Sequence, residues 1–176
     1  MTLAQAYYAL AAFLCLGGWL VFSGSSLLVS FRRDRSATLL LLGLAVGWFA
    51  WQLYTMPEPD LAGLPRNLVM IVFVGASLLT YVYMPDFLSV RSFGVLMLFL
   101  ARLTLDAGYR QLPYSLLDAS VAYGVLVLFG FWWAASPVAF NQHCDWVLAT
   151  PLRRKLVGGL GVALGLACLY NSTRLA

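Results

Sequence analysis

Long apolar runs alternate along the chain with short polar segments, and six of the runs approach the length of a membrane-spanning helix. A helix needs about 20 mostly apolar residues to cross a hydrocarbon core of roughly 30 Å. The polar breaks carry arginines, prolines and acidic turn residues. The pattern therefore predicts six transmembrane helices, over 7–29, 37–54, 68–84, 87–107, 116–135 and 152–170.

Local signals mark several of the expected helix ends. Asp86 is predicted to cap the fourth helix, because an aspartate side chain accepts a hydrogen bond from the first free backbone N–H groups. Ser115 and Asp118 have the spacing of a capping box at the start of the fifth helix. Pro137 ends that helix, and Pro151 opens the sixth.

A short amphipathic segment, 137–149, separates the last two runs. It is too short to span a bilayer, so it is predicted to form a helix that lies in the membrane interface. His143, Cys144 and Asp145 would point in three directions about 100° apart, which argues against a triad or a metal site. Its expected apolar face consists of Phe140, Cys144, Val147 and Leu148.

Composition agrees with the apolar pattern. Of the 176 residues, 62% are hydrophobic and 10% are charged, whereas a typical soluble domain is about 45–50% apolar and roughly 25% charged. This balance excludes an ordinary soluble enzyme, a disordered tail and a nucleic-acid-binding module. The expected fold class is all-α: one integral membrane domain over 1–176, with six transmembrane helices and one interfacial helix.

Few side chains are available for chemistry. The chain has one lysine, Lys155, one histidine, His143, and three cysteines without a C-x-x-C spacing. These counts argue against a bis-histidine haem and a zinc site. No nucleophile elbow, H-E-x-x-H or P-loop motif is present. We therefore expect no enzymatic activity, no cofactor and no metal.

The basic residues predict an orientation. Cytoplasmic loops of membrane proteins carry an excess of lysine and arginine. Seven basic residues fall on one side of the predicted bundle and four on the other, so both termini are expected outside the cytoplasm, in the inner membrane if the source is bacterial. The two sets are Arg32, Arg33, Arg35, Arg91, Arg153, Arg154 and Lys155, against Arg66, Arg102, Arg110 and Arg174.

The fourth helix carries charges inside its apolar run. Arg91 and Arg102 are eleven residues apart and differ by roughly 20° around a helix axis. Asp106 and Tyr109 follow on nearly the same line, so all four residues are expected to form one polar stripe. Asp106 is also placed to neutralise Arg102 at i,i+4 spacing.

Two interpretations of this polar stripe remain open. An arginine near the middle of a span costs ~2.5–3.5 kcal/mol on insertion scales. Both arginines lie close enough to a helix end to extend to the headgroups, which is a purely structural explanation. Alternatively, the polar stripe faces another helix or a water-filled cavity, where it would bind an anionic group, move a proton or dock a partner.

Small residues recur at i,i+4 spacing on three of the predicted helices. Such pairs let two helix backbones approach closely, and close packing drives helix association in lipid. They indicate packing either within the bundle or against a partner. The pairs are Gly43 with Gly47, Ser120 with Gly124, and Gly161 with Gly165.

These observations favour a multi-pass membrane protein that acts as a non-enzymatic accessory or assembly component. Its expected partners are the lipid bilayer and either another membrane protein or a second copy, and no nucleic acid. The alternative is a small transporter or channel in which the polar stripe lines a path for an anion or another solute.

Overall fold

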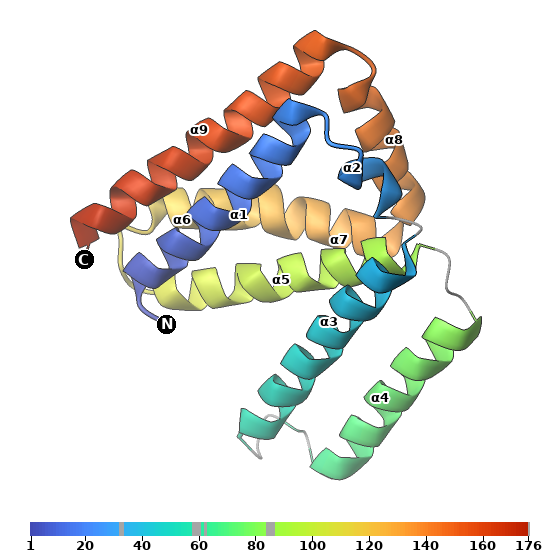
Figure 1. The fold of residues 1–176 in the computed structure, drawn as a ribbon. Coiled ribbons are helices and arrows are strands. Elements are labelled where there is room, and N and C mark those ends of the chain that lie inside the picture. The colour runs from blue at the N-terminus through green and yellow to red at the C-terminus, as the bar shows by residue number, and fades with distance from the viewer. Residues whose placement is uncertain (32–33, 58–60, 62, 84–86, 176) are drawn as a thin grey trace.

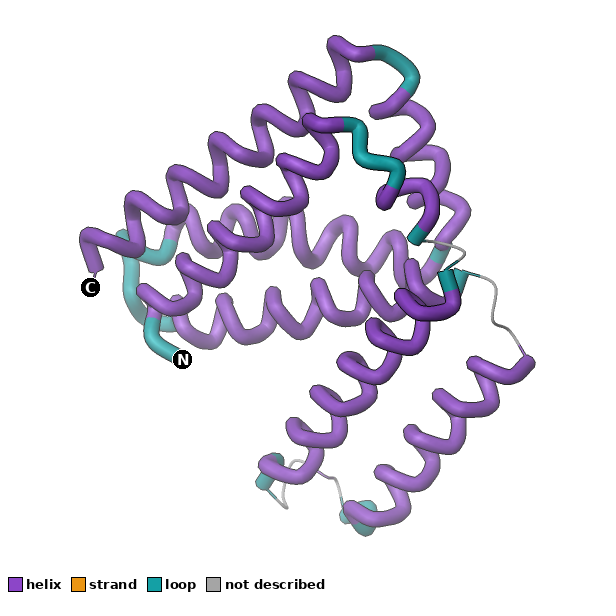
Figure 2. The backbone as a smooth tube through the Cα atoms, in the orientation of Figure 1, coloured by secondary structure: helices purple, strands orange, loops and turns teal. Residues whose placement is uncertain are grey.

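The computed structural model describes residues 1–31, 34–57, 61, 63–83 and 87–175. All regular structure in these residues is helical, which confirms the predicted all-α class. Six helices are long and apolar enough to cross a membrane, as expected of a multi-pass membrane protein. They are α1 (Leu3–Ser23), α3 (Arg35–Thr55), α4 (Arg66–Tyr83), α5 (Leu88–Gly108), the composite helix α6–η2–α7 (Leu116–Ala135) and α9 (Pro151–Leu175). Short loops and two short helices, α2 (Leu27–Ser30) and α8 (Pro137–Leu148), connect them (Figure 2).

Helices α1 and α9 run antiparallel, side by side, along most of their length (Figure 1). Glycines bring their backbones into contact. A Cβ atom built on Gly158 of α9 would lie 2.5 Å from the backbone nitrogen of Phe22 and 2.7 Å from the carbonyl oxygen of Gly18. Only glycine allows this approach, which strengthens the van der Waals contact that holds helices together in lipid.

A second close pair is formed by α5 and the composite helix α6–η2–α7, which lie antiparallel beneath α1 and α9 (Figure 1). Here Gly94 faces Gly130. A Cβ atom on Gly94 would lie 2.6 Å from the carbonyl oxygen of Gly130. The bundle therefore has two glycine-mediated helix pairs, and the one formed by α5 and α7 involves none of the predicted small-residue pairs.

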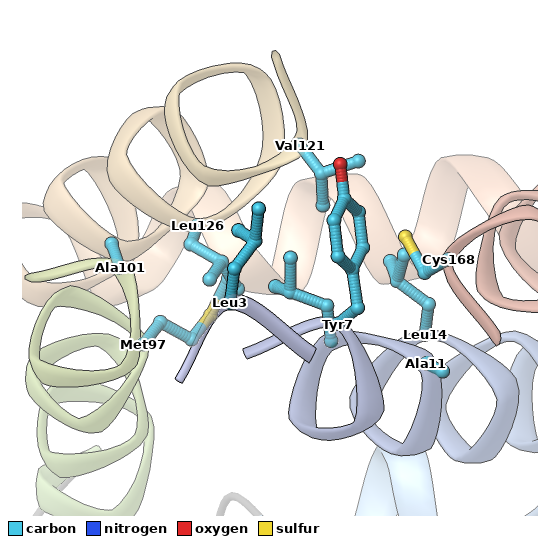
Figure 3. Packing of buried hydrophobic residues seen from close by; sticks show 10 residues of the cluster. Leu3, Tyr7, Ala11, Leu14, Met97, Ala101, Val121, Leu126 and Cys168 are labelled. Carbon is cyan, nitrogen blue, oxygen red and sulfur yellow. The ribbon is translucent and has the colours of Figure 1, made fainter. Parts of the chain in front are cut away.

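The core lies where the two helix pairs meet. Tyr7 and Leu10 of α1 and Leu126 of η2 are completely buried there. Figure 3 shows the side chain of Tyr7 upright between Val121 and Cys168. The α1 residues thus tie the α5 pair to α9, because they contact both. The buried cluster consists of Leu3, Tyr7, Leu10, Ala11, Leu14, Met97, Ala101, Val121, Leu126 and Cys168.

Helices α3 and α4 form a hairpin that projects away from this core (Figure 1). Trp48 of α3 packs against Phe99 of α5, with ring centroids 5.8 Å apart. The outer helix α4 stacks Phe73 on Phe49 of α3 at 3.8 Å. Arg66 donates a hydrogen bond to the carbonyl oxygen of Met56 at 2.7 Å across the hairpin loop. No residue of α4 is buried, so the hairpin leaves one whole helix nearly unpartnered within the described chain.

The first helix differs from its predicted bounds of 7–29. A capping box formed by Thr2 and Gln5 starts α1 at Leu3. Gly24 then ends α1 in the left-handed conformation, with φ 65°, and its N–H returns to the last carbonyl groups. Glycine adopts this conformation without a steric penalty, so it stops a helix even inside an apolar run.

The fifth predicted helix, 116–135, is continuous but changes its hydrogen-bond pattern. Residues 122–127 form a π-helical segment, in which the N–H of Leu128 bonds to the carbonyl oxygen of Tyr123. An extra residue per turn rotates the following side chains around the axis relative to a regular α-helix, and such insertions are frequent at functional sites. Hydrophobic periodicity did not reveal this segment.

The amphipathic helix α8 covers residues predicted from 137 to 149, and it lies across the end of α7 (Figure 1). Phe140 is buried on its inner face. Trp133 of α7 donates a hydrogen bond from Nε1 to Nδ1 of His143 at 3.1 Å. His143 therefore fixes the corner between α7 and α8. The predicted cap at Asp86 lies outside the described residues.

Candidate functional site

The predicted polar stripe on α5 is divided between the two ends of the helix. At the start of α5, Arg91 is exposed and donates from Nη1 to the carbonyl oxygen of Ala134 at 3.2 Å. That carbonyl belongs to the last turn of α7, where an α-helix lacks its own donors. Arg91 thus ties the ends of two neighbouring helices together.

At the other end, Arg102 and Asp106 form an ion pair, with Nε and Oδ2 3.7 Å apart. Their side chains are 54% and 70% exposed. Tyr109 is exposed as well, and the guanidinium of Arg110 lies 5.1 Å from its ring centroid. These side chains therefore lie on the surface of the described chain at this end of α5, where the length of an arginine side chain allows it to reach the headgroup level.

The three predicted small-residue pairs fall into two groups. Gly161 and Gly165 lie against α1, where Cβ atoms built on them would meet the Cα of Gly18 at 3.1 Å and the Sγ of Cys15 at 2.5 Å. A Cβ atom on Gly43, Gly47 or Gly124 would meet no other atom within 4 Å. Ser120 is exposed and donates to its own helix, to the carbonyl oxygen of Leu116.

Gly43 lines an apolar groove of about 270 Å³ between α3 and α4. The groove is open on one side because the two helices contact each other sparsely. Because no residue of α4 is buried, this hairpin is loosely packed compared with the rest of the described chain. The groove is lined by Leu39, Leu42, Gly43, Val46, Val74, Ser77, Leu78 and Tyr81.

A buried polar cluster, which the sequence did not predict, links α1 to the start of α6. The hydroxyl of Tyr7 donates to the carbonyl oxygen of Tyr114 at 2.6 Å and accepts from the backbone N–H of Asp118 at 3.2 Å. In the predicted capping box that N–H would bond to the side chain of Ser115. Ser115 makes no capping hydrogen bond, so the predicted capping box is wrong. The hydroxyl of Tyr7, from α1, accepts the hydrogen bond that the side chain of Ser115 was predicted to accept.

The carboxyl group of Asp118 is completely buried, and neither oxygen has a hydrogen-bond partner among the described residues. It lies against the end of α5, where a Cβ atom on Gly108 would be 2.7 Å from Oδ2. An unpaired buried polar group of this kind is costly and needs an explanation. One feature of the sequence is consistent with an unpaired carboxyl group here: no lysine or arginine lies within four residues of Asp118.

Asp118→Asn is expected to stabilise the protein by roughly 1 kcal/mol or more. The substitution keeps the shape of the side chain, and a neutral amide costs less to bury than an ionised carboxylate. The measurement is thermal unfolding in detergent, followed by circular dichroism. Asp106→Asn, at an exposed carboxyl, serves as the control and should change stability by less than about 0.5 kcal/mol. A clear fall in the melting temperature of Asp118→Asn would show that the carboxyl has a partner.

Among the described residues, no three histidine, cysteine, aspartate or glutamate side chains are grouped to hold a metal ion. Comparisons of the chain with protein-family models, with curated proteins and with solved structures found no match.

Proposed function

We propose that this chain is a non-enzymatic accessory or assembly component of a membrane, and that it packs a transmembrane helix of another protein into the groove between α3 and α4. One observation carries the proposal. The chain uses the same glycine spacing twice: on α9 it is filled by α1 at backbone contact, and on α3 it faces open space.

A partner helix suits the groove better than lipid chains do, for a packing reason. Lipid tails are as apolar as leucine, so association in a bilayer depends on close van der Waals contact. Gly43 and Gly47 remove side-chain bulk at the same face of α3, one turn apart. A helix laid there gains the backbone approach that α1 and α9 already show, and it also covers α4.

The exposed charges of α5 fit the same proposal. Arg91 holds the end of α7, and Arg102 is neutralised by Asp106. These residues then serve helix anchoring rather than solute passage. We further propose that the end bearing Arg91 faces the cytoplasm, with both termini outside, because the larger basic set lies at that end.

The test compares Gly43→Leu with Gly17→Leu in the full-length chain. Both glycines lie on open helix faces, and a Cβ atom on either meets nothing within 4 Å, so both variants should fold. Leucine at position 43 fills the groove and is expected to weaken association with the membrane partner at least about tenfold, or ~1.4 kcal/mol. Leucine at position 17 should leave association unchanged. The measurement is the yield of the complex after tagged purification in mild detergent.

Two results would contradict the proposal. Equal recovery of the complex with both variants would mean that the groove is not the contact. Purification of the wild-type chain as a homo-oligomer free of other proteins would mean that the face serves self-association.

A further inference from the structure

We propose that the end of the bundle where α1 stops and α9 begins binds the phosphate group of an anionic phospholipid, with Arg154 as the main contact. This inference is independent of the partner helix at the α3–α4 groove, because it concerns the opposite pair of helices. The ligand chemistry is a phosphate that carries apolar chains.

Arg154 is held in place by the turn that ends α1. Its side chain lies against Gly24, so that a Cβ atom built there would be 2.8 Å from Cζ, 2.9 Å from Cδ and closer still to Nη1. Gly24 has the left-handed φ of 65° and no side chain. Because Gly24 has no side chain, the turn leaves room for the guanidinium of Arg154 against the end of α1.

The hydrogen-bonding capacity of this guanidinium is unused within the described chain. The Nε of Arg154 is buried and has no hydrogen-bond partner, and no described carboxylate lies within ion-pair distance. The nearby carbonyl oxygens of Leu20 and Val21 already accept from Ser25 and Gly24. Arg154 is partly exposed, and its terminal amino groups make no hydrogen bond within the described chain, so a phosphate oxygen supplies them with an acceptor that arginine binds well.

Neighbouring residues on α9 and α8 point to a lipid as the source of the phosphate. Arg153 lies over the ring of Trp146, 4.8 Å from its centroid, and Lys155 is exposed beside it. Tryptophan with basic residues is typical of the headgroup level, and basic sites between membrane helices bind anionic lipid heads. Val157, three residues after Arg154 on α9, and Phe22 at the end of α1 are exposed, so acyl chains have an apolar surface beside the basic group.

The experiment measures lipid retention by the purified full-length chain in native mass spectrometry. The probes are phosphatidylglycerol and phosphatidylcholine at equal concentration, with inorganic phosphate as a competitor. The wild-type chain should retain phosphatidylglycerol over phosphatidylcholine. Arg154→Gln should reduce that preference about fivefold. Arg174→Gln removes a charge from the other end of α9 and should leave the preference unchanged.

The remaining outcomes decide whether the bound phosphate belongs to a lipid or is free, and whether Arg154 binds it. Displacement of the lipid by millimolar inorganic phosphate would overturn the lipid assignment in favour of a free-phosphate site. Equal preference in Arg154→Gln and the wild type would overturn the role of Arg154. If Arg154→Gln fails to fold, Arg154→Lys replaces it: lysine keeps the charge but lacks the planar fork, so a partial loss is expected and an unchanged preference would contradict the proposal.

Discussion

Gly158→Ala is expected to lower the free energy of unfolding by about 1–3 kcal/mol, although alanine normally favours a helix over glycine. The added methyl group would press on the backbone of α1, at the nitrogen of Phe22 and the carbonyl oxygen of Gly18. Backbone atoms cannot turn aside as a flexible side chain can. The helices must therefore separate, and contact along the α1–α9 pair is lost.

The control is the next residue. A Cβ atom on Gly159 meets nothing within 4 Å, so Gly159→Ala should be neutral or stabilise the helix by up to about 1 kcal/mol. Both variants are unfolded in mixed micelles by increasing the fraction of denaturing detergent, and helix content is followed by circular dichroism. Equal stability of the two variants would show that α1 and α9 do not meet at the described distance.

Tyr7→Phe is expected to cost about 1–3 kcal/mol, because it removes one hydroxyl that bonds to a buried backbone N–H and to a partly buried carbonyl oxygen. The carbonyl oxygen of Tyr114 loses its donor, and the N–H of Asp118 loses its acceptor. The phenyl ring still fills the same space, so packing of the core is unchanged. The loss therefore reports the hydrogen bonds that join α1 to the start of α6.

Tyr8→Phe is the matched control, because Tyr8 is adjacent in sequence and its side chain is 44% exposed. Its stability should lie within about 0.5 kcal/mol of the wild type in the same unfolding assay. A loss as large in Tyr8→Phe as in Tyr7→Phe would assign the effect to the helix and not to the buried cluster.

The helical architecture was predictable because one physical requirement dominates it. A bilayer demands long apolar helices with all backbone groups paired, so run length alone predicts their number and approximate bounds. The first helix was predicted too long at its end because apolar residues continue past Gly24, whereas the backbone turns there. The π-helical segment, 122–127, was missed because its residues are as apolar as those of an α-helix.

The Tyr7–Asp118 cluster was not predictable from local spacing. Ser115 and Asp118 fit a capping box, yet the acceptor for the helix N–H comes from Tyr7, more than a hundred residues earlier in the chain. Only the tertiary contact between α1 and α6 reveals it. A buried acid without a basic neighbour is the one local sign that the sequence offers.

Small-residue spacing predicts that two backbones can approach but does not identify the helix that fills the space. Gly161 and Gly165 meet α1, whereas Gly43 and Gly47 meet nothing in the described chain. The partners Gly18 and Gly94 belong to none of the predicted pairs, because one small residue opposite another is enough for contact. The open pair on α3 therefore needs another molecule to fill the space beside it.

Site-specific photo-crosslinking from position 43 in intact membranes would identify the molecule that lies against the open glycine pair of α3. A photoreactive side chain at position 43 is compared with the same side chain at position 17, which also faces open space. We expect an adduct from position 43, absent from position 17, whose crosslinked peptide belongs to a transmembrane segment of another protein. Crosslinks from position 43 to lipid alone, or to a second copy of the chain, would contradict this expectation.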